Sequence, residues 1–245
     1  MSALRVPVAG LHVGLLDLDA FASHYVSKVN RLGAGDRFVV FDPEARLEAD
    51  AVVVRVSRKC VVCDVTDVRA ARLVALRPLW LLQGLSKGER FDLAVRDATA
   101  LGVTDIVPVG LARCDVKLAE ASESRRSRWA RIAAESSRQC GRGDVPMLHP
   151  YLDVKRALEM VPRGSVRLCL WELATRPISQ FAQLISTASS LAVLIGPEGG
   201  LDEAEVQQAR DSGFDDVSFG PFILRTETAA TAALGAVRAL WGRDG

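Results

Sequence analysis

The sequence predicts a small β-rich module followed by a larger α/β domain built around a mainly parallel sheet. The chain has 245 residues, which is more than an average single domain contains. Its first part consists of short β-branched runs separated by turn residues, whereas the rest alternates apolar runs with amphipathic stretches. The change in pattern falls near residue 72, so we expect domains over residues 1–72 and 73–245.

Three strands are expected in the first domain, over residues 37–41, 51–56 and 60–65. Turn signals separate them at residues 33–36, 42–43 and 57–59. Cys60 and Cys63 form a C-x-x-C pair, but residues three apart on a strand point to opposite faces. No second pair follows at zinc-ribbon spacing, and the five cysteines are an odd, scattered set. We therefore expect no metal site and reduced thiols.

The second domain is predicted to alternate strands and helices in the manner of β-α units. The strongest helix signal is Asp202 followed three residues on by Glu205, which is a capping box, and Gly213 suits the end of the same helix. The strands are expected over residues 79–82, 105–109, 166–171, 191–195 and 217–219, and the helices start near Lys87, Glu123, Leu152, Ile178, Asp202 and Thr228.

Composition indicates an ordinary soluble globular protein, with 49% apolar residues, 25% charged residues and a net charge of +1. No segment reaches the ~20 apolar residues of a membrane span, and residues 1–10 lack the apolar run of a signal peptide. We expect a cytoplasmic protein without membrane contact. The overall charge excludes a strong field around the whole molecule, so a nucleic-acid partner would need a local basic patch.

One stretch has the required basic excess, because residues 113–142 hold eight arginines or lysines and four acids. On a helix from Glu123, Trp129 and Ala133 fall on one side, and three of the arginines project from about the opposite side. A solvated surface helix has the same pattern, but the density of charge favours RNA phosphates. The candidate RNA-binding residues are Arg125, Arg126, Arg128, Arg131, Arg138 and Arg142.

Two loops are candidates for chemistry. The buried run over residues 191–195 leads into Gly196-Pro197-Glu198-Gly199-Gly200, and ligands of α/β proteins bind at this end of a parallel strand. The loop is not a phosphate loop, and a simple tight turn is the alternative interpretation. The second loop ends in Leu224-Arg225-Thr226-Glu227-Thr228, where Thr226 or Thr228 can cap a helix. Arg225 has no such structural reason, which makes it a candidate for stabilising negative charge.

These two motifs, preceded by Leu170-Trp171-Glu172, resemble the bacterial small-subunit ribosomal RNA uridine-N3 methyltransferases of the SPOUT superfamily. The similarity extends to Gln83-Gly84-Leu85-Ser86-Lys87-Gly88, and it covers nearly the whole chain. It implies an N-terminal PUA-like β-barrel that helps to bind RNA, followed by a SPOUT α/β domain with a C-terminal trefoil knot. The expected partner is small-subunit ribosomal RNA, either naked or in the assembled subunit.

The resemblance also implies that three loops form the knot and hold S-adenosyl-L-methionine, which carries no phosphate and needs no P-loop lysine. A homodimer is expected to complete the site, and the helix after Thr228 offers small residues for close packing at Ala229, Ala232, Ala233 and Ala236, with Leu240. The expected cofactor contacts are Leu170, Trp171, Glu172, Ile195, Gly196, Gly199, Gly200, Phe219, Gly220, Ile223, Leu224 and Thr228.

Methylation at uridine N3 requires loss of the N3 proton and stabilisation of the pyrimidine anion. Arg225 is the expected stabiliser, and the proton leaves through Glu198, or through a main-chain carbonyl and water. Ala100 departs from the family pattern, which usually has an acid there. Two alternatives therefore stay open: a related methyltransferase acting on another RNA, and a non-catalytic RNA-binding assembly factor.

Overall fold

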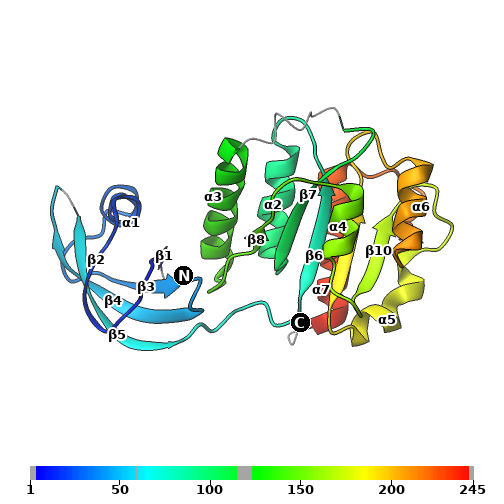
Figure 1. Cartoon of the computed structure of the whole chain (residues 1–245). Coiled ribbons are helices and arrows are strands. Elements are labelled where there is room, and N and C mark those ends of the chain that lie inside the picture. The colour runs from blue at the N-terminus through cyan, green and yellow to red at the C-terminus, as the bar shows by residue number, and fades with distance from the viewer. Residues whose placement is uncertain (1–3, 59, 115–122, 243–245) are drawn as a thin grey trace. The chain divides into compact units, whose positions relative to one another are not determined.

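A computed structural model describes residues 4–58, 60–114 and 123–242 of the chain (Figure 1). It divides the chain into two compact units. The first comprises Met1–Val74 together with Ala134–Val145, and the second comprises Ala75–Ala133 together with Pro146–Gly245. Lys59, the last residue of one predicted turn, lies outside the described residues.

The first unit contains one five-stranded sheet in the order β1-β3-β4-β5-β2. β1 is parallel to β3, and the other neighbours are antiparallel. The prediction of a β-rich module is confirmed. The described strands do not close into the barrel that the family resemblance implied, but form an open sheet with β1 and β2 at its edges. The strands are β1 (Arg5–Pro7), β2 (Gly14–Asp17), β3 (Arg37–Asp42), β4 (Leu47–Val56) and β5 (Val61–Ala70).

The sheet folds because alternate residues of its long strands are apolar. Ala49, Ala51 and Val53 of β4 point into one core, which also contains Val26 from the short helical segment after β2. That segment consists of α1 (Ala20–His24) and a π-helix (Tyr25–Val29). β1, β2 and α1 were not predicted, since none has a periodic apolar pattern longer than a few residues.

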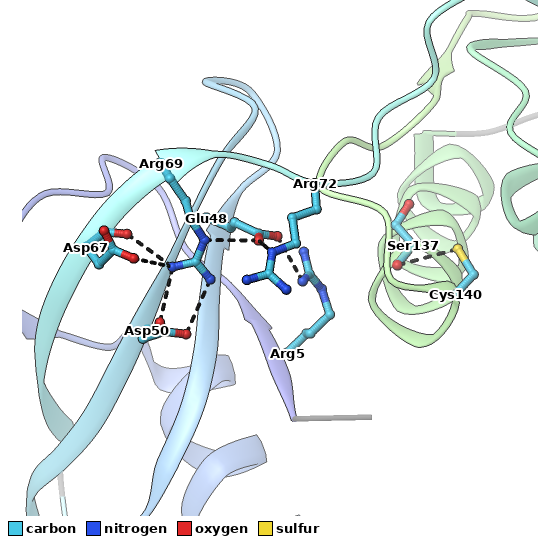
Figure 2. Close-up of polar contacts among 8 residues, drawn as sticks. All are labelled: Arg5, Glu48, Asp50, Asp67, Arg69, Arg72, Ser137 and Cys140. Atoms are coloured by element: carbon cyan, nitrogen blue, oxygen red, sulfur yellow. Dashed lines mark hydrogen bonds and ion pairs between the residues drawn. The ribbon is translucent and has the colours of Figure 1, made fainter. Parts of the chain in front are cut away.

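A buried carboxylate joins three arginines in the first unit. Glu48 is 1% exposed, and its carboxylate lies 3.0 Å from Arg5 Nη1 and 3.4 Å from both Arg69 Nε and Arg72 Nε (Figure 2). Arg69 also donates to Asp50 from both of its terminal nitrogens. Removing one partner of a buried ion pair lowers the stability of a protein by about 3–5 kcal/mol. Because Arg5, Glu48 and Arg69 belong to β1, β4 and β5, their ion pairs help to hold these three strands together.

The second unit contains a seven-stranded parallel sheet in the order β12-β10-β11-β6-β7-β8, with β9 also paired to β7. All five residues of β11 are buried, as expected for a strand covered on both faces. The strands are β6 (Leu79–Gly84), β7 (Asp105–Gly110), β8 (Met147–Leu148), β9 (Leu152–Asp153), β10 (Val166–Leu170), β11 (Leu191–Ile195) and β12 (Asp215–Val217).

Helices cover both faces of this sheet (Figure 1). One core cluster joins α4 and α6 to side chains such as Trp80, Leu82 and Leu194. On the other side α7 packs against α2, α5 and β11, and Trp241 Nε1 donates to the carbonyl of Ile185 at 2.7 Å. The helices of this unit are α2 (Arg90–Ala100), α4 (Val154–Met160), α5 (Ala182–Thr187), α6 (Glu203–Asp211) and α7 (Thr226–Trp241), with a 3-10 turn at Ile178–Phe181. α3 (Glu123–Cys140) begins in this unit, and its residues from Ala134 onward belong to the first unit.

Most of the predicted elements are present, with shifted ends. Asp202 caps α6 in a complete capping box with Glu205, as predicted, and Gly213 follows the helix with φ +82°. The last strand ends at Val217 rather than Phe219. Leu152 belongs to β9, so α4 starts two residues later than expected. No described helix is both long and apolar enough to cross a membrane.

Candidate active site

A pocket of about 520 Å³ lies at the carboxyl ends of β10, β11 and β12. This is the edge of a parallel sheet at which α/β proteins bind ligands. Three loops line it: Leu170–Glu172, Ile195–Leu201 and the segment from Val217 to Glu227. It brings together every residue expected to contact the cofactor except Thr228, which is exposed on α7 and does not line the pocket.

The glycine-rich loop after β11 is a tight turn, in which Gly200 N donates to Pro197 O at 3.0 Å and Gly200 has φ +74°. A Cβ on Gly196 would lie 2.9 Å from the carbonyl carbon of Gly200, so this position has no room for a side chain. A Cβ on Gly199 would lie 2.9 Å from Arg113 Cβ. A side chain at position 199 would therefore meet Arg113, although Gly199 itself lines the pocket.

The Glu198 carboxylate connects the glycine-rich loop to the segment after β6. Its Oε1 accepts hydrogen bonds from Lys87 N at 3.1 Å and from Arg90 Nη1 at 2.7 Å. These two hydrogen bonds give Glu198 a role in positioning the loop. The choice between Glu198 and a main-chain carbonyl with water as the proton route stays a prediction.

Arg225 occupies the N-cap position of α7, with extended backbone and no side-chain cap. The expectation that Thr226 or Thr228 caps this helix is wrong, because Thr226 is its first helical residue and its hydroxyl donates to Gly196 O at 2.6 Å. Arg225 is exposed and lines the pocket. Among the described residues, the structure gives its guanidinium no ion-pair or hydrogen-bond partner, so its charge is available to a ligand.

Ion pairs at the sheet edge support the loop that contains Trp171. The Arg210 guanidinium lies 5.4 Å from the centre of the Trp171 ring, and its Nε donates to Asp216 Oδ1 at 2.9 Å. This hydrogen bond lowers the pKa of Asp216. Arg176 pairs with Asp215 at 2.9 Å, which secures the same edge strand. Ion pairs as well as sheet hydrogen bonds thus stabilise the side of the pocket that the loop Leu170–Glu172 lines.

The six candidate RNA-binding arginines do not form one face. Arg128 pairs with Asp92 at 2.5 Å, and Arg126 lies 3.8 Å from Glu123. Arg138 lies 3.7 Å above the Tyr25 ring within the first unit. Arg125 is half-buried, and Arg131 is exposed.

Arg142 corrects the sequence interpretation, because it is buried rather than projecting toward solvent. It is 6% exposed, and its Nε and Nη2 bond both oxygens of Asp144 at 2.9 and 3.0 Å. A two-pronged pair of this kind leaves little of the guanidinium for an RNA phosphate. Its contribution is to the fold of the first unit.

The C-x-x-C pair forms no metal site in the structure. Cys63 is buried, and burial raises the pKa of its thiol to about 11, whereas Cys60 is half-buried. Across the described part of the chain, no group of three or more histidine, cysteine or acidic side chains is placed to hold a metal ion. All five cysteines are free thiols that form no disulfide.

The sequence interpretation assigned no role at the site to two residues next to the pocket loops, Gln83 and Arg90. Arg90 is the first residue of α2 and lines the pocket. Nothing in the sequence distinguished it from an ordinary surface arginine near the start of a helix. Gln83 is 1% exposed and donates to the Thr226 hydroxyl at 2.8 Å. A lone polar residue at the carboxyl end of the apolar run Leu79-Trp80-Leu81-Leu82 was the available signal.

A parallel α/β domain with a pocket lined by a glycine-rich loop fits the class of RNA methyltransferases, and residues 75–238 match the family model of the RNA methyltransferase domain. The chain is 30% identical to ribosomal RNA small subunit methyltransferase E of Bacillus subtilis (strain 168), over 87% of this chain and 86% of that protein. It is 33% identical to the protein of the same name from Mycobacterium bovis, over 92% and 87%.

A solved structure shows the same fold. Ribosomal RNA small subunit methyltransferase E from Neisseria gonorrhoeae, bound to S-adenosyl methionine, matches 98% of both chains with a TM-score of 0.88 and 28% sequence identity. The chain therefore belongs to the family of ribosomal RNA small subunit methyltransferase E.

Proposed function

We propose that this protein transfers a methyl group from S-adenosylmethionine to N3 of one uridine in small-subunit ribosomal RNA. The observation that carries the proposal is the pocket at the carboxyl ends of β10, β11 and β12, with the unpartnered Arg225 on its wall. The names of the relatives support ribosomal RNA as the substrate, and the relative whose structure was solved with S-adenosyl methionine supports this molecule as the cofactor.

The residues present fit this cofactor. A pocket of about 520 Å³ lies within the usual range for a small-molecule site. Its loops offer main-chain groups, and the apolar Ile195, Leu201 and Leu224 offer contact for an adenine ring. When bound, S-adenosylmethionine supplies a methyl group activated by its positively charged sulfur.

Arg225 then has a defined task in the reaction. The N3 proton would pass to Glu198 or to a water held by a main-chain carbonyl. Bound S-adenosylmethionine would supply the methyl group to the nitrogen lone pair and would leave as S-adenosylhomocysteine. A guanidinium beside the pyrimidine oxygens stabilises the negative charge that develops on the ring. Because Glu198 is bonded to Arg90, it positions the loop during this step.

The knot belongs to the same proposal. Along the chain, β6 comes before β10, β11 and β12. In the sheet, however, β11 lies next to β6, and β10 and β12 lie on the far side of β11 from β6. The first residue of α7 bonds the loop after β11 through the Thr226 hydroxyl, so these two segments are in direct contact. A trefoil path through them accounts for both features. The open sheet of the first unit is in turn proposed to act as a PUA-like RNA-binding module.

The altered α2 sequence leaves the pocket intact. Ala100 lies exposed at the end of α2 and does not line the pocket. The missing acid therefore gives no reason to assign a non-catalytic role. Cytoplasmic location follows in this proposal from the ribosomal RNA substrate.

A homodimer is proposed to complete the site, and light scattering at micromolar concentration tests it. Ala229 and Ala233 are buried within the chain, so they are not available to a partner. Ala232 and Ala236 are half-buried and Leu240 is 39% exposed, which leaves a narrower strip for helix packing. A mass of two chains is expected, and a fully active monomer would contradict the proposal.

The proposed reaction can be reconstituted directly. Purified protein is incubated with S-adenosylmethionine and either naked small-subunit RNA or assembled subunits, and the nucleosides are separated by mass spectrometry. We expect 3-methyluridine to appear with one of the two substrates. Cofactor binding without any methylated nucleoside would support the assembly-factor alternative, and a ribose-methylated product would support the alternative RNA methyltransferase.

A further inference from the structure

Two buried polar side chains lie between the pocket loops and the sheet. Gln83, at the end of β6, is 1% exposed, and Thr226, at the start of α7, is 6% exposed. They meet the carbonyl of Gly196, where the glycine-rich loop begins. Three segments that are distant in sequence therefore join through one chain of hydrogen bonds.

The direction of each hydrogen bond in this chain is determined by its neighbours. The Thr226 hydroxyl donates its single proton to Gly196 O at 2.6 Å, so toward Gln83 it can only accept. Gln83 must then present its amide nitrogen, which donates to Thr226 Oγ1 at 2.8 Å and to Gly84 O at 3.3 Å. The amide oxygen of Gln83 is left buried, and none of the residues that the structure describes pairs with it.

An unpaired buried oxygen is unfavourable for stability. Leucine at this position would continue the apolar run of β6 and leave no polar group unsatisfied. Stability alone therefore does not explain the glutamine. The next residue is equally constrained, because a Cβ on Gly84 would lie 2.6 Å from Pro197 N. The end of β6 is thus adapted to the glycine-rich loop.

We propose that Gln83 is a positioning residue of the active site. By holding the Thr226 hydroxyl in the orientation that bonds Gly196 O, it keeps the glycine-rich loop and the first turn of α7 at a constant separation. Arg225 precedes Thr226, so its guanidinium is directed at the pocket by the same contact. The effect on methylation rests on the proposed function, whereas the effect on the two loops does not.

Gln83→Leu tests the proposal, with hydrogen exchange of the loop amides as the deciding measurement. We expect a melting temperature equal to or above that of the unchanged protein. We also expect exchange in residues 195–201 to be at least tenfold faster and cofactor affinity, measured by calorimetry, to be several-fold weaker. Thr226→Val should give the same pattern, and the double variant should be no worse than Thr226→Val alone, since both changes break one chain of contacts.

Two further variants separate positioning from general loosening. Thr226→Ser retains the hydroxyl and should restore most of the loop protection. Thr231→Val removes a matched hydroxyl from the same helix, one that donates to Glu227 O at 2.9 Å, and should leave loop exchange unaltered. Unchanged exchange and cofactor affinity in Gln83→Leu would overturn the proposal, and so would a loss that merely follows a lower melting temperature. Absence of methylation by the unchanged protein would instead overturn the proposed function.

Discussion

At the scale of single residues, the arrangement around Arg225 separates charge that is used in the fold from charge that is available for chemistry. Arg90, Arg113, Arg176 and Arg210 all donate to acceptors on neighbouring segments. Arg225, on the pocket wall, has no such partner among the described residues. The sequence could single out Arg225 because nothing in the local helix start required a basic residue there.

Arg225→Ala should lower the rate of methylation at saturating substrates more than it lowers affinity for either one. A guanidinium interacts weakly with neutral uridine and strongly with the anion formed when N3 loses its proton, so its effect is on the transition state. Loss of one such donor is expected to cost about 100-fold in rate, or about 3 kcal/mol. Single-turnover methylation measured across pH is the test.

Arg225→Lys provides the matched comparison for this experiment. Lysine retains the charge but not the planar two-pronged contact, so it should restore only part of the rate. A defect of Arg225→Ala that disappears when the cofactor is saturating would mean that Arg225 only shapes the cofactor pocket.

Asp42 is a second residue with a measurable effect, on stability. Burial by itself would raise the pKa of its carboxyl, but hydrogen bonds from Ala45 N, Leu11 N, Gly10 N and Glu44 N lower it overall. A lowered pKa means that the ionised form stabilises the fold above the unfolded value of about 3.9, and that this contribution is lost as the pH falls through the folded value.

Asp42→Asn should therefore be less stable than the unchanged protein at pH 7, by about 1–3 kcal/mol. The difference should shrink as the pH falls below about 4, because Asp42 then takes up a proton. Urea unfolding of both proteins between pH 2 and 7 measures this. A difference in stability that is constant over this range would show that the charge of Asp42 contributes nothing.

At the scale of secondary structure, the elements with strong local signals could be predicted, and those determined by distant contacts could not. The capping box of α6 and the apolar run of β11 are complete within a few residues of sequence. The start of α7 was misplaced because Thr226 bonds Gly196, thirty residues away, instead of its own helix. β8 and β9 have two residues each and follow from pairing with β7.

The basic helix yields a prediction about RNA binding. Among the described residues, Arg125 and Arg131 have no ion-pair partner and Arg126 has only a 3.8 Å contact with Glu123, so replacing all three by alanine should remove about three phosphate contacts. The slope of log K against log salt should then flatten by roughly two to three units. Binding of small-subunit RNA, measured by fluorescence anisotropy at several salt concentrations, tests this.

Arg142→Ala is the control for the basic helix. Because Arg142 is buried against Asp144, its loss should lower the melting temperature and leave the salt slope unaltered. An unchanged slope in the triple variant would mean that α3 is a solvated surface helix, the alternative that the sequence left open.

At the scale of the whole molecule, the sequence predicted the order of the two parts but not their discontinuity. The change in sequence pattern placed the domain boundary near residue 72. In the structure, the first compact unit comprises Met1–Val74 and also contains Ala134–Val145. Contacts such as Gly143 N to Leu73 O at 2.7 Å join these segments, and no periodicity reports such a pairing. The proposed knot would be hidden from sequence patterns for the same reason.

The candidate site was more accessible to sequence reasoning than the path of the chain. The loops that line the pocket follow parallel strands and contain the two most distinctive motifs, so their residues could be grouped in advance. The space beside Gly199 and the partners of Glu198 could not be predicted, because they depend on Arg113 and Arg90 from other segments.

The most direct test of the account is mass-spectrometric nucleoside mapping of small-subunit ribosomal RNA from cells that lack this protein. We expect one 3-methyluridine to be missing, to return when the unchanged protein is supplied, and to stay absent or strongly reduced with Arg225→Ala at equal protein level. A complete set of methylated uridines in the deleted cells would contradict the proposed function.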